Sequence, residues 1–119
     1  MSLKVYGIPT CGTCNKARKW LESHGIAYEF LDTKTHPPSR EQIQSWVASL
    51  GTKPLRNTSG QAYRAIDPSD RQAWSEAQWI DAFADNAMLL KRPLFVADGR
   101  AIMAGFRGSD AEMLSQLQG

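Results

Sequence analysis

The sequence predicts an α/β domain that has a four-stranded mixed sheet and a helical insertion. Strand, helix and strand patterns follow one another over residues 3–30 and indicate a β-α-β unit at the N-terminus. An Asp-Gly pair at 98–99, between two apolar runs, indicates a β-hairpin. Helical patterns fill the chain between these units. The order is therefore β-α-β, helices, β-β-α, in one domain over 1–119 with the insertion at about 39–88.

The N-terminal unit begins with a short buried strand at Leu3–Gly7. The helix that follows runs from Cys14 to His24, and Gly25 ends it. Ala17, Trp20, Leu21 and His24 recur in it at helical spacing. A second strand follows, with alternating Ile26, Tyr28 and Phe30. Such short turns imply a right-handed parallel crossover between the two strands.

The insertion contains two longer helices. Ser39 and Gln42 form a capping-box signal ahead of apolar residues at helical spacing, namely Ile43, Trp46, Val47 and Leu50. Residues 51–68 are rich in turn formers and predict a loop, with a short helical turn near 67–73. A further helix at about 75–86 is indicated by Trp79, Ile80 and Phe83.

The C-terminal unit returns to the sheet. Leu94–Ala97 and Arg100–Ala104 flank the Asp-Gly pair, which supplies the positive φ angles of a tight hairpin turn. Ser109 can cap a last helix, whose buried face would be Met113, Leu114 and Leu117.

Composition and charge exclude several classes of partner. The chain is 42% hydrophobic and 22% charged, which is typical of a globular protein. A formal net charge of +2 is too small to imply a nucleic-acid or membrane partner, since such binding needs a concentrated basic patch. The apolar stretch Leu3–Ile8 is too short for a membrane span or a signal-peptide core. We therefore expect a cytoplasmic monomer that binds neither membrane nor nucleic acid directly.

The chemistry is expected at Cys11 and Cys14, where the first strand gives way to the first helix. Unpaired N–H groups and the helix dipole stabilise an anion there, which lowers the pKa of a thiol. Further positive charge comes from Lys16, Arg18 and Lys19. Cys11 would be the attacking thiolate, and Cys14, one turn later, would resolve a mixed disulfide by closing the pair.

Two other interpretations of the cysteine pair remain open. A Cys-x-x-Cys segment is also half of a four-ligand zinc site, but the chain has no second pair, and His24 and His36 do not have metal-site spacing. We therefore expect no metal. The cysteines would alternatively be inert residues at the edge of the core.

Arg92 and Pro93 stand directly before the third predicted strand. The planar guanidinium of Arg92 suits a carboxylate, an oxyanion or a thiolate in the site. Proline is also tolerated at the first residue of a strand for structural reasons alone, and Arg92 would alternatively be a solvated surface residue.

Four segments resemble the glutaredoxin-linked arsenate reductase (ArsC) and Spx family. Ile8–Arg18, with the sequence Ile-Pro-Thr-Cys-Gly-Thr-Cys-Asn-Lys-Ala-Arg, resembles its active-site loop, and Lys91-Arg92-Pro93 resembles its second signature. Asn57–Arg64 resembles the family segment Asn-Lys-Arg-Gly-Thr-Thr-Trp-Arg, and Gly105-Phe106 resembles the residues that end its hairpin. The resemblance implies a thioredoxin-like fold. It also makes Pro93 a cis proline beside Cys11 that supports the backbone of a substrate.

The chain departs from the arsenate reductases of this family at three places. Those enzymes carry Ser at the position of Cys14 and hold the oxyanion with three arginines. Arg92 matches one of the three, Arg56 lies near another, and Arg107 lies two positions beyond the third, where Gly105 stands. Cys14 instead resembles the Cys-x-x-Cys of Spx- and MgsR-type members.

Two functions follow from these residues and the resemblance. The first is a thiol-dependent oxidoreductase in which Cys11 is the nucleophile, Cys14 the resolving thiol and Arg92 the stabiliser of an anion or thiolate. Substrate binding is expected at Gly12, Thr13, Arg64 and Pro93. Glutathione is a candidate co-substrate, because its carboxylates would meet Lys16, Arg64 and Arg92, and glutaredoxin or thioredoxin are candidate partners. The alternative is an Spx-like redox-sensing regulator that binds the C-terminal domain of the RNA polymerase α-subunit.

Overall fold

The computed structural model describes residues 2–106. Its strands are β1 (Leu3–Gly7), β2 (Glu29–Asp32), β3 (Leu94–Ala97) and β4 (Arg100–Ala104). Its helices are α1 (Gly12–Ser23), α2 (Arg40–Leu50), α3 (Gln61–Arg64), α4 (Pro68–Ala73), α5 (Glu76–Asp85) and the 3₁₀ helix η1 (Ala87–Leu89). The sheet has the order β2-β1-β3-β4; β1 is parallel to β2 and antiparallel to β3, and β3 is antiparallel to β4. This mixed sheet, interrupted by helices between β2 and β3, confirms the predicted fold class.

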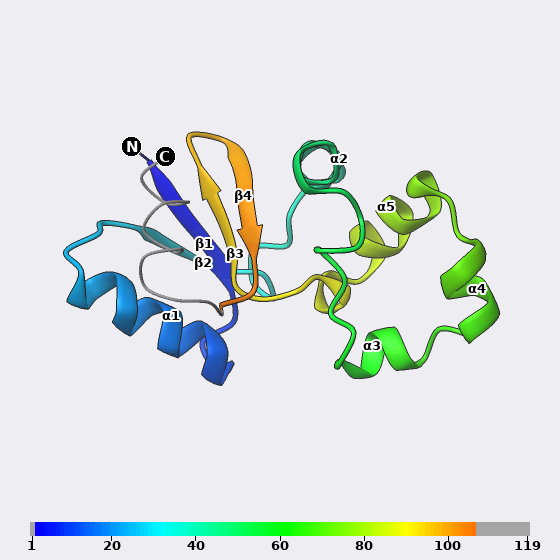
Figure 1. Ribbon diagram of the computed structural model, residues 1–119, viewed down its shortest axis with the longest axis horizontal. Coiled ribbons are helices and arrows are strands. Elements are labelled where there is room, and N and C mark those ends of the chain that lie inside the picture. Colours follow the sequence, from blue (N-terminus) through cyan, green and yellow to red (C-terminus); the bar gives the residue numbers. More distant parts are fainter. Residues whose placement is uncertain (1, 107–119) are drawn as a thin grey trace.

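The sheet is covered by helices on both faces (Figure 1). Successive side chains of a strand point to opposite faces. Val5 and Phe95 accordingly pack with Leu21 of α1. Tyr6 and Leu94 belong to a larger cluster with residues of α2 and α5 on the other face. The remaining insertion helices continue away from the sheet, so Figure 1 shows α1 and α3–α5 at opposite ends of the molecule.

The predicted elements are largely confirmed, with local differences at their ends. α1 begins at Gly12, two residues before the predicted start. The second strand begins at Glu29, because the Ile26 N–H instead donates to the carbonyl of Leu21 (2.9 Å) where α1 ends. Asp98 and Gly99 adopt φ angles of 52° and 82°, as the hairpin prediction requires. The helix predicted from Ser109 onward, with Met113, Leu114 and Leu117, lies outside the described residues.

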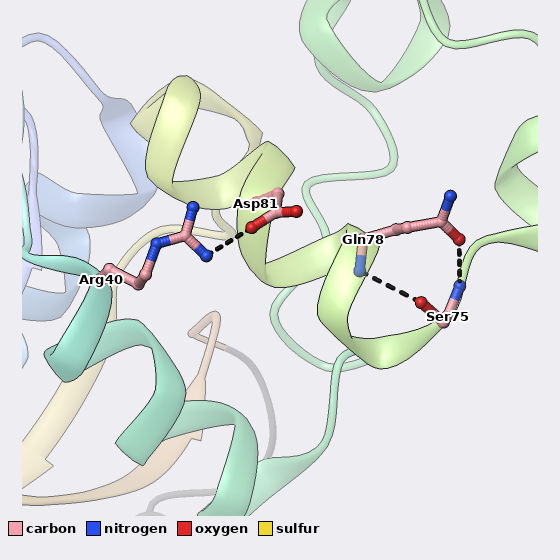
Figure 2. A network of polar contacts seen from close by, with 4 residues as sticks. All are labelled: Arg40, Ser75, Gln78 and Asp81. Carbon is pink, nitrogen blue, oxygen red and sulfur yellow. Dashed lines mark hydrogen bonds and ion pairs between the residues drawn. The ribbon is translucent and has the colours of Figure 1, made fainter.

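The insertion helices begin where their capping residues stand. Ser39 Oγ and Ser75 Oγ each accept a hydrogen bond from the backbone N–H three residues later. The N–H groups of the two serines in turn donate to Oε1 of Gln42 and of Gln78, so both helices have complete capping boxes. Figure 2 shows the Ser75–Gln78 box beside an ion pair between Arg40 of α2 and Asp81 of α5. The short turn predicted near 67–73 is α4, with Asp67 as its cap.

A backbone ladder joins the insertion to the chain that leads into β3. Arg56 and Leu90 form an antiparallel bridge. On either side of it, the Asn57 N–H donates to the carbonyl of Leu89 (2.8 Å), and the Lys91 N–H donates to the carbonyl of Leu55 (2.7 Å). The loop before α3 is thereby held against the segment directly before Arg92. None of the helices described between residues 2 and 106 is long and apolar enough to cross a membrane.

Candidate functional site

Cys11 lies in the loop between β1 and α1 and is the N-cap residue of that helix. Its carbonyl accepts the N–H of Asn15 (3.1 Å), and its own N–H donates to the carbonyl of Ile8 (3.2 Å). The Asn15 side chain donates to the carbonyl of Pro9 (3.0 Å) and closes the loop. The first turn of α1 has no acidic side chain. The start of the helix therefore stabilises negative charge on the Cys11 thiol.

Two opposing effects set the pKa of Cys11. Desolvation by partial burial is the largest single effect and raises the pKa. Hydrogen bonds from the backbone and side chain of Cys14, the side chain of Arg92 and the backbone of Thr13 lower it. Together these bonds prevail, and the pKa of Cys11 lies below its ordinary value. The thiolate fraction of Cys11 is correspondingly raised at neutral pH.

Cys14 has the opposite character. It is fully buried, and desolvation is the main cause that raises its pKa to about 11. The hydrogen bond and the charge of Cys11 raise the pKa further, whereas the Ile8 backbone and the charge of Arg92 lower it. Both cysteines are free. The site therefore pairs a thiol whose lowered pKa favours the thiolate with a thiol that stays neutral at pH 7 and donates a hydrogen bond to it.

Gly7, at the end of β1, makes room for the buried sulfur. A Cβ atom at this position would lie 2.5 Å from Cys14 Sγ, which is closer than nonbonded atoms approach. Thr33 fixes this end of the strand, because its N–H donates to the carbonyl of Gly7 (2.9 Å). The absence of a side chain at Gly7 thus positions Cys14 beneath the loop that carries Cys11.

Arg92 approaches Cys11 from the other side of the site. The peptide bond between Arg92 and Pro93 is cis, as the resemblance implies. Arg92 Nη1 donates to Met88 O (3.4 Å) and to Met88 Sδ (3.7 Å), and both contacts are long. Arg92 Nε is buried and has no hydrogen-bond partner among the described residues. The bonds to Met88 are therefore weak anchors for the guanidinium, which also donates to Cys11.

These residues surround a hollow of about 320 Å³, which we call the thiol hollow. Its lining residues are Cys11, Thr13, Asn57, Ser59, Gly60, Lys91, Arg92, Gly105 and Phe106. The volume suits a small molecule or one side of an extended chain. Within the described part of the chain, no three His, Cys, Asp or Glu side chains are grouped so that they could hold a metal ion.

The structure places the predicted site residues in three different settings. Cys11, Thr13 and Arg92 line the thiol hollow. Cys14 and Pro93 are buried beside residues that line it. Gly12, Lys16 and Arg64 lie outside the lining. The three cationic groups expected around glutathione are therefore not gathered in this hollow; of the three, Arg92 alone lines it.

Several lining residues were not predicted as binding residues. Asn57, Ser59 and Gly60 come from the loop before α3, which the backbone ladder holds in place. Their signals in the sequence were the resemblance of the segment from Asn57 to Arg64 and its turn-forming composition. Lys91 adjoins Arg92, and its side chain passes Gly105, where a Cβ atom would lie 2.8 Å from Lys91 Cε.

Arg56, which lies near one of the family's oxyanion arginines in the sequence, is engaged elsewhere. Its guanidinium carbon lies 3.9 Å from the ring centroid of Trp79. Its Nη2 donates to Thr52 Oγ1 (2.8 Å). Burial lowers the pKa of Arg56, and it does not line the thiol hollow. Arg107 lies outside the described residues, so Arg92 is the arginine that the described chain brings to Cys11.

Comparison with known proteins identifies relatives along nearly the whole chain. An uncharacterised protein of Bacillus subtilis (strain 168), YusI, is 37% identical over 115 residues, which cover 94% of this chain and 97% of the relative. The global transcriptional regulator Spx of Streptococcus pyogenes serotype M3 (strain ATCC BAA-595 / MGAS315) is 31% identical over 100 residues, covering 82% of this chain and 73% of Spx.

Solved structures also resemble this chain. A crystal structure described as a possible arsenate reductase from Streptococcus mutans UA159 superposes with a TM-score of 0.83 at 32% identity, covering 93% of this chain and 96% of the other. These relatives support a thioredoxin-like fold and a thiol oxidoreductase-like family. The model of the ArsC family matches residues 6–113. With its thiol pair at the start of α1 and its cis Arg-Pro step, the chain belongs to the ArsC family.

Proposed function

We propose that the protein is a thiol-disulfide oxidoreductase in which Cys11 attacks and Cys14 resolves. The observation that carries the proposal is the contrast between the two thiols. Cys11 is partly exposed in a hollow and has a lowered pKa, whereas Cys14 is buried with a pKa of about 11. The lowered pKa of Cys11 favours the attacking thiolate, and Cys14 stays a neutral thiol until the mixed disulfide has formed.

In the first step the Cys11 thiolate attacks one sulfur of a substrate disulfide. A bond forms between Cys11 and that sulfur, the substrate S–S bond breaks, and the leaving thiolate takes a proton. Cys11 no longer carries charge in this mixed disulfide, so two of the causes that raise the pKa of Cys14 disappear.

In the second step Cys14 loses its proton and attacks the Cys11 sulfur. The Cys11–Cys14 disulfide forms, and the second substrate thiol leaves. The two electrons that reduce the substrate come from the two cysteines. An external thiol reductant, for which glutathione, glutaredoxin or thioredoxin are the candidates, then restores the pair.

The arginines favour disulfides over arsenate as the acceptor. Three guanidinium groups around the nucleophile would suit a multiply charged oxyanion. In the described chain Arg92 lines the thiol hollow, while Arg56 lies on Trp79. A single guanidinium matches the single charge of a thiolate or of one carboxylate.

A turnover assay tests this proposal. The reduced protein is mixed with glutathione, glutaredoxin or thioredoxin as donor and with either a small disulfide or arsenate as acceptor. We expect turnover of the disulfide, lost in Cys11→Ser, and little reduction of arsenate. Absence of turnover with every donor and acceptor would refute the enzyme.

A redox-sensing regulator is the second candidate, favoured by the 31% identity with Spx. The same closure of Cys11 with Cys14 would then change a binding surface rather than reduce a substrate. Its test is binding of the C-terminal domain of the RNA polymerase α-subunit to the reduced and the oxidised protein. Binding that depends on the redox state, together with no turnover, would show that the protein is a regulator and not an enzyme.

A further inference from the structure

A second hollow, of about 470 Å³, adjoins the thiol hollow. The two share three lining residues, Asn57, Gly60 and Arg92. The second hollow continues toward the insertion, where its other lining residues are Gln61, Ala62, Asn86 and Met88. A substrate whose sulfur meets Cys11 can therefore extend past Arg92 into this space.

The lining chemistry of the second hollow favours an acceptor group. Asn57, Gln61 and Asn86 bring carboxamides and Arg92 brings a guanidinium, and the lining includes no acidic side chain among the described residues. The bonds that hold the walls are long, with Asn57 Nδ2 at 3.5 Å from Met88 O. A bound carboxylate would give the Asn57 carboxamide and the Arg92 guanidinium a stronger acceptor than the carbonyl of Met88.

Two of the carboxamides are held in place before any ligand arrives. Asn86 Oδ1 accepts the N–H of Met88 (3.0 Å), which leaves the NH₂ end of the same side chain for a ligand. Gly60 packs directly on Asn57, since a Cβ atom at position 60 would lie 2.6 Å from Asn57 Nδ2. Fixed donors reduce the ordering cost of binding.

We propose that the second hollow binds a carboxylate-bearing, amide-containing arm of the substrate while its sulfur reacts with Cys11. The inference rests on the proposed oxidoreductase function and adds the specificity of that site. Such an arm occurs in a small peptide disulfide and also in a protein segment with an acidic residue near its cysteine. Both sources share the chemistry that Arg92 and the carboxamides recognise.

The test uses substitutions that change charge at nearly constant shape. Gln61→Glu and Asn86→Asp each place a negative charge in the second hollow, and the carboxylate introduced by Asn86→Asp keeps an oxygen that can accept the Met88 N–H. Gln72→Glu makes the same change of charge at an exposed residue of α4 that lines neither hollow. Single-turnover loss of thiols is followed with glutathione disulfide, with the disulfide of N-acetylcysteinamide, which has amides but no charge, and with bis(2-hydroxyethyl) disulfide, which has no arm.

We expect Gln61→Glu and Asn86→Asp to slow the reaction with glutathione disulfide about three- to fivefold, the effect of one partly screened charge pair. The rates with the uncharged amide disulfide and with the armless disulfide should stay unchanged, and Gln72→Glu should react as the unaltered protein does. Equal slowing with all three disulfides, or no slowing with any, would overturn the inference. The disulfide of a capped cysteine peptide with a nearby Glu represents the protein segment, and glutathione disulfide represents the small peptide. The one that reacts faster with the unaltered protein identifies the source of the arm.

Binding of S-methylglutathione, which has the arm but no reactive sulfur, separates this inference from the proposed function. Titration calorimetry that shows weaker binding in Gln61→Glu and Asn86→Asp than in Gln72→Glu supports the second hollow even if no disulfide is reduced. Conversely, reduction of the armless disulfide without any charge effect on the armed one would leave the function standing and refute the arm site.

Discussion

At the scale of single residues, Arg92 connects the charge of the site to its reactivity. Its side chain donates a hydrogen bond that lowers the pKa of Cys11. The distance from its Nη1 to Met88 O, 3.4 Å, is long for a hydrogen bond. The helix start acts on Cys11 through fixed backbone groups, whereas Arg92 acts through a side chain that can be replaced without altering the backbone. Substitution at Arg92 therefore isolates one cause of thiol activation.

We expect Arg92→Met to raise the pKa of Cys11 and to slow its alkylation by iodoacetamide at pH 7 roughly fivefold. This corresponds to a loss of about 1 kcal/mol for a hydrogen bond to a charged group at a partly exposed site. Arg100→Met is the control, because Arg100 is exposed at the start of β4 and lines neither hollow. Equal alkylation rates in Arg92→Met and the unaltered protein would contradict this role.

The raised pKa of Cys14 makes the stability of the fold depend on pH. Its pKa is raised to about 11 in the folded protein, compared with about 8.5 in an unfolded chain. The folded state thus holds a proton that the unfolded state releases, so this contribution to stability is complete below about pH 8.5 and is lost as pH rises toward 11. The loss is on the order of 3 kcal/mol.

Urea denaturation under reducing conditions checks this expectation. The free energy of unfolding should fall more steeply between about pH 8.5 and 11 in the unaltered protein than in Cys14→Ala. Identical pH slopes in the two proteins would show that Cys14 is not a buried neutral thiol. Cys11→Ser should retain most of this slope, since burial is the largest cause that raises the pKa of Cys14 and the hydrogen bond and charge of Cys11 add less.

At the scale of secondary-structure elements, the junction of β1 and α1 places the two thiols. β1 ends at Gly7 against the Cys14 sulfur, and α1 begins directly after Cys11. Much of this was predictable, because an apolar strand, a Cys-x-x-Cys segment and an amphipathic helix are consecutive in the sequence. The close approach of Gly7 to Cys14 could not be predicted, because it depends on how α1 packs on the sheet.

Gly7→Ala should destabilise the protein by about 1–3 kcal/mol, since the new methyl group overlaps the Cys14 sulfur. Formation of the Cys11–Cys14 disulfide should slow as well. Gly12→Ala is a matched control, because nothing lies within 4 Å of a Cβ atom there, and we expect it to be neutral or stabilising by up to about 1 kcal/mol. Similar unfolding curves for the two variants would refute the packing argument.

The insertion shows where prediction from sequence stops. The capping serines Ser39 and Ser75 are local signals, and both stand where the sequence predicts a helix to begin. The four-residue α3 lies within a predicted loop, because so short a helix has no periodicity. It is supported by packing of Tyr63 on the core and stacking on Trp79, contacts between residues distant in sequence. Asn57, Ser59 and Gly60 of the thiol hollow likewise depend on contacts distant in sequence, namely the backbone bonds to the segment before Arg92.

At the scale of the whole molecule, the insertion and the site are mechanically connected. Trp79 is nearly fully buried and contacts Trp74, Tyr63 and Phe83, and it lies under the Arg56 guanidinium. Arg56 in turn forms the backbone bridge that leads into the Arg-Pro step. The helices beyond the sheet therefore help to hold one wall of the thiol hollow.

Trp79→Leu should accordingly cost about 2–4 kcal/mol of stability and also slow alkylation of Cys11, although Trp79 does not line the thiol hollow. Trp74→Leu, at a half-buried position in the same cluster, should cost less. Urea denaturation gives the stability, and iodoacetamide kinetics on the folded variants give the reactivity. An unchanged alkylation rate in folded Trp79→Leu would show that the insertion and the site are independent.

The division of labour between the two thiols is the central claim, and trapping of the mixed disulfide tests it most directly. Reduced Cys14→Ser and Cys11→Ser are mixed with bis(2-hydroxyethyl) disulfide at neutral pH, and the modified residue is identified by peptide mass spectrometry. We predict a persistent adduct on Cys11 in Cys14→Ser, little adduct in Cys11→Ser, and rapid closure of Cys11 with Cys14 in the unaltered protein. An adduct that forms on Cys14 in Cys11→Ser as fast as on Cys11 in Cys14→Ser would contradict the account.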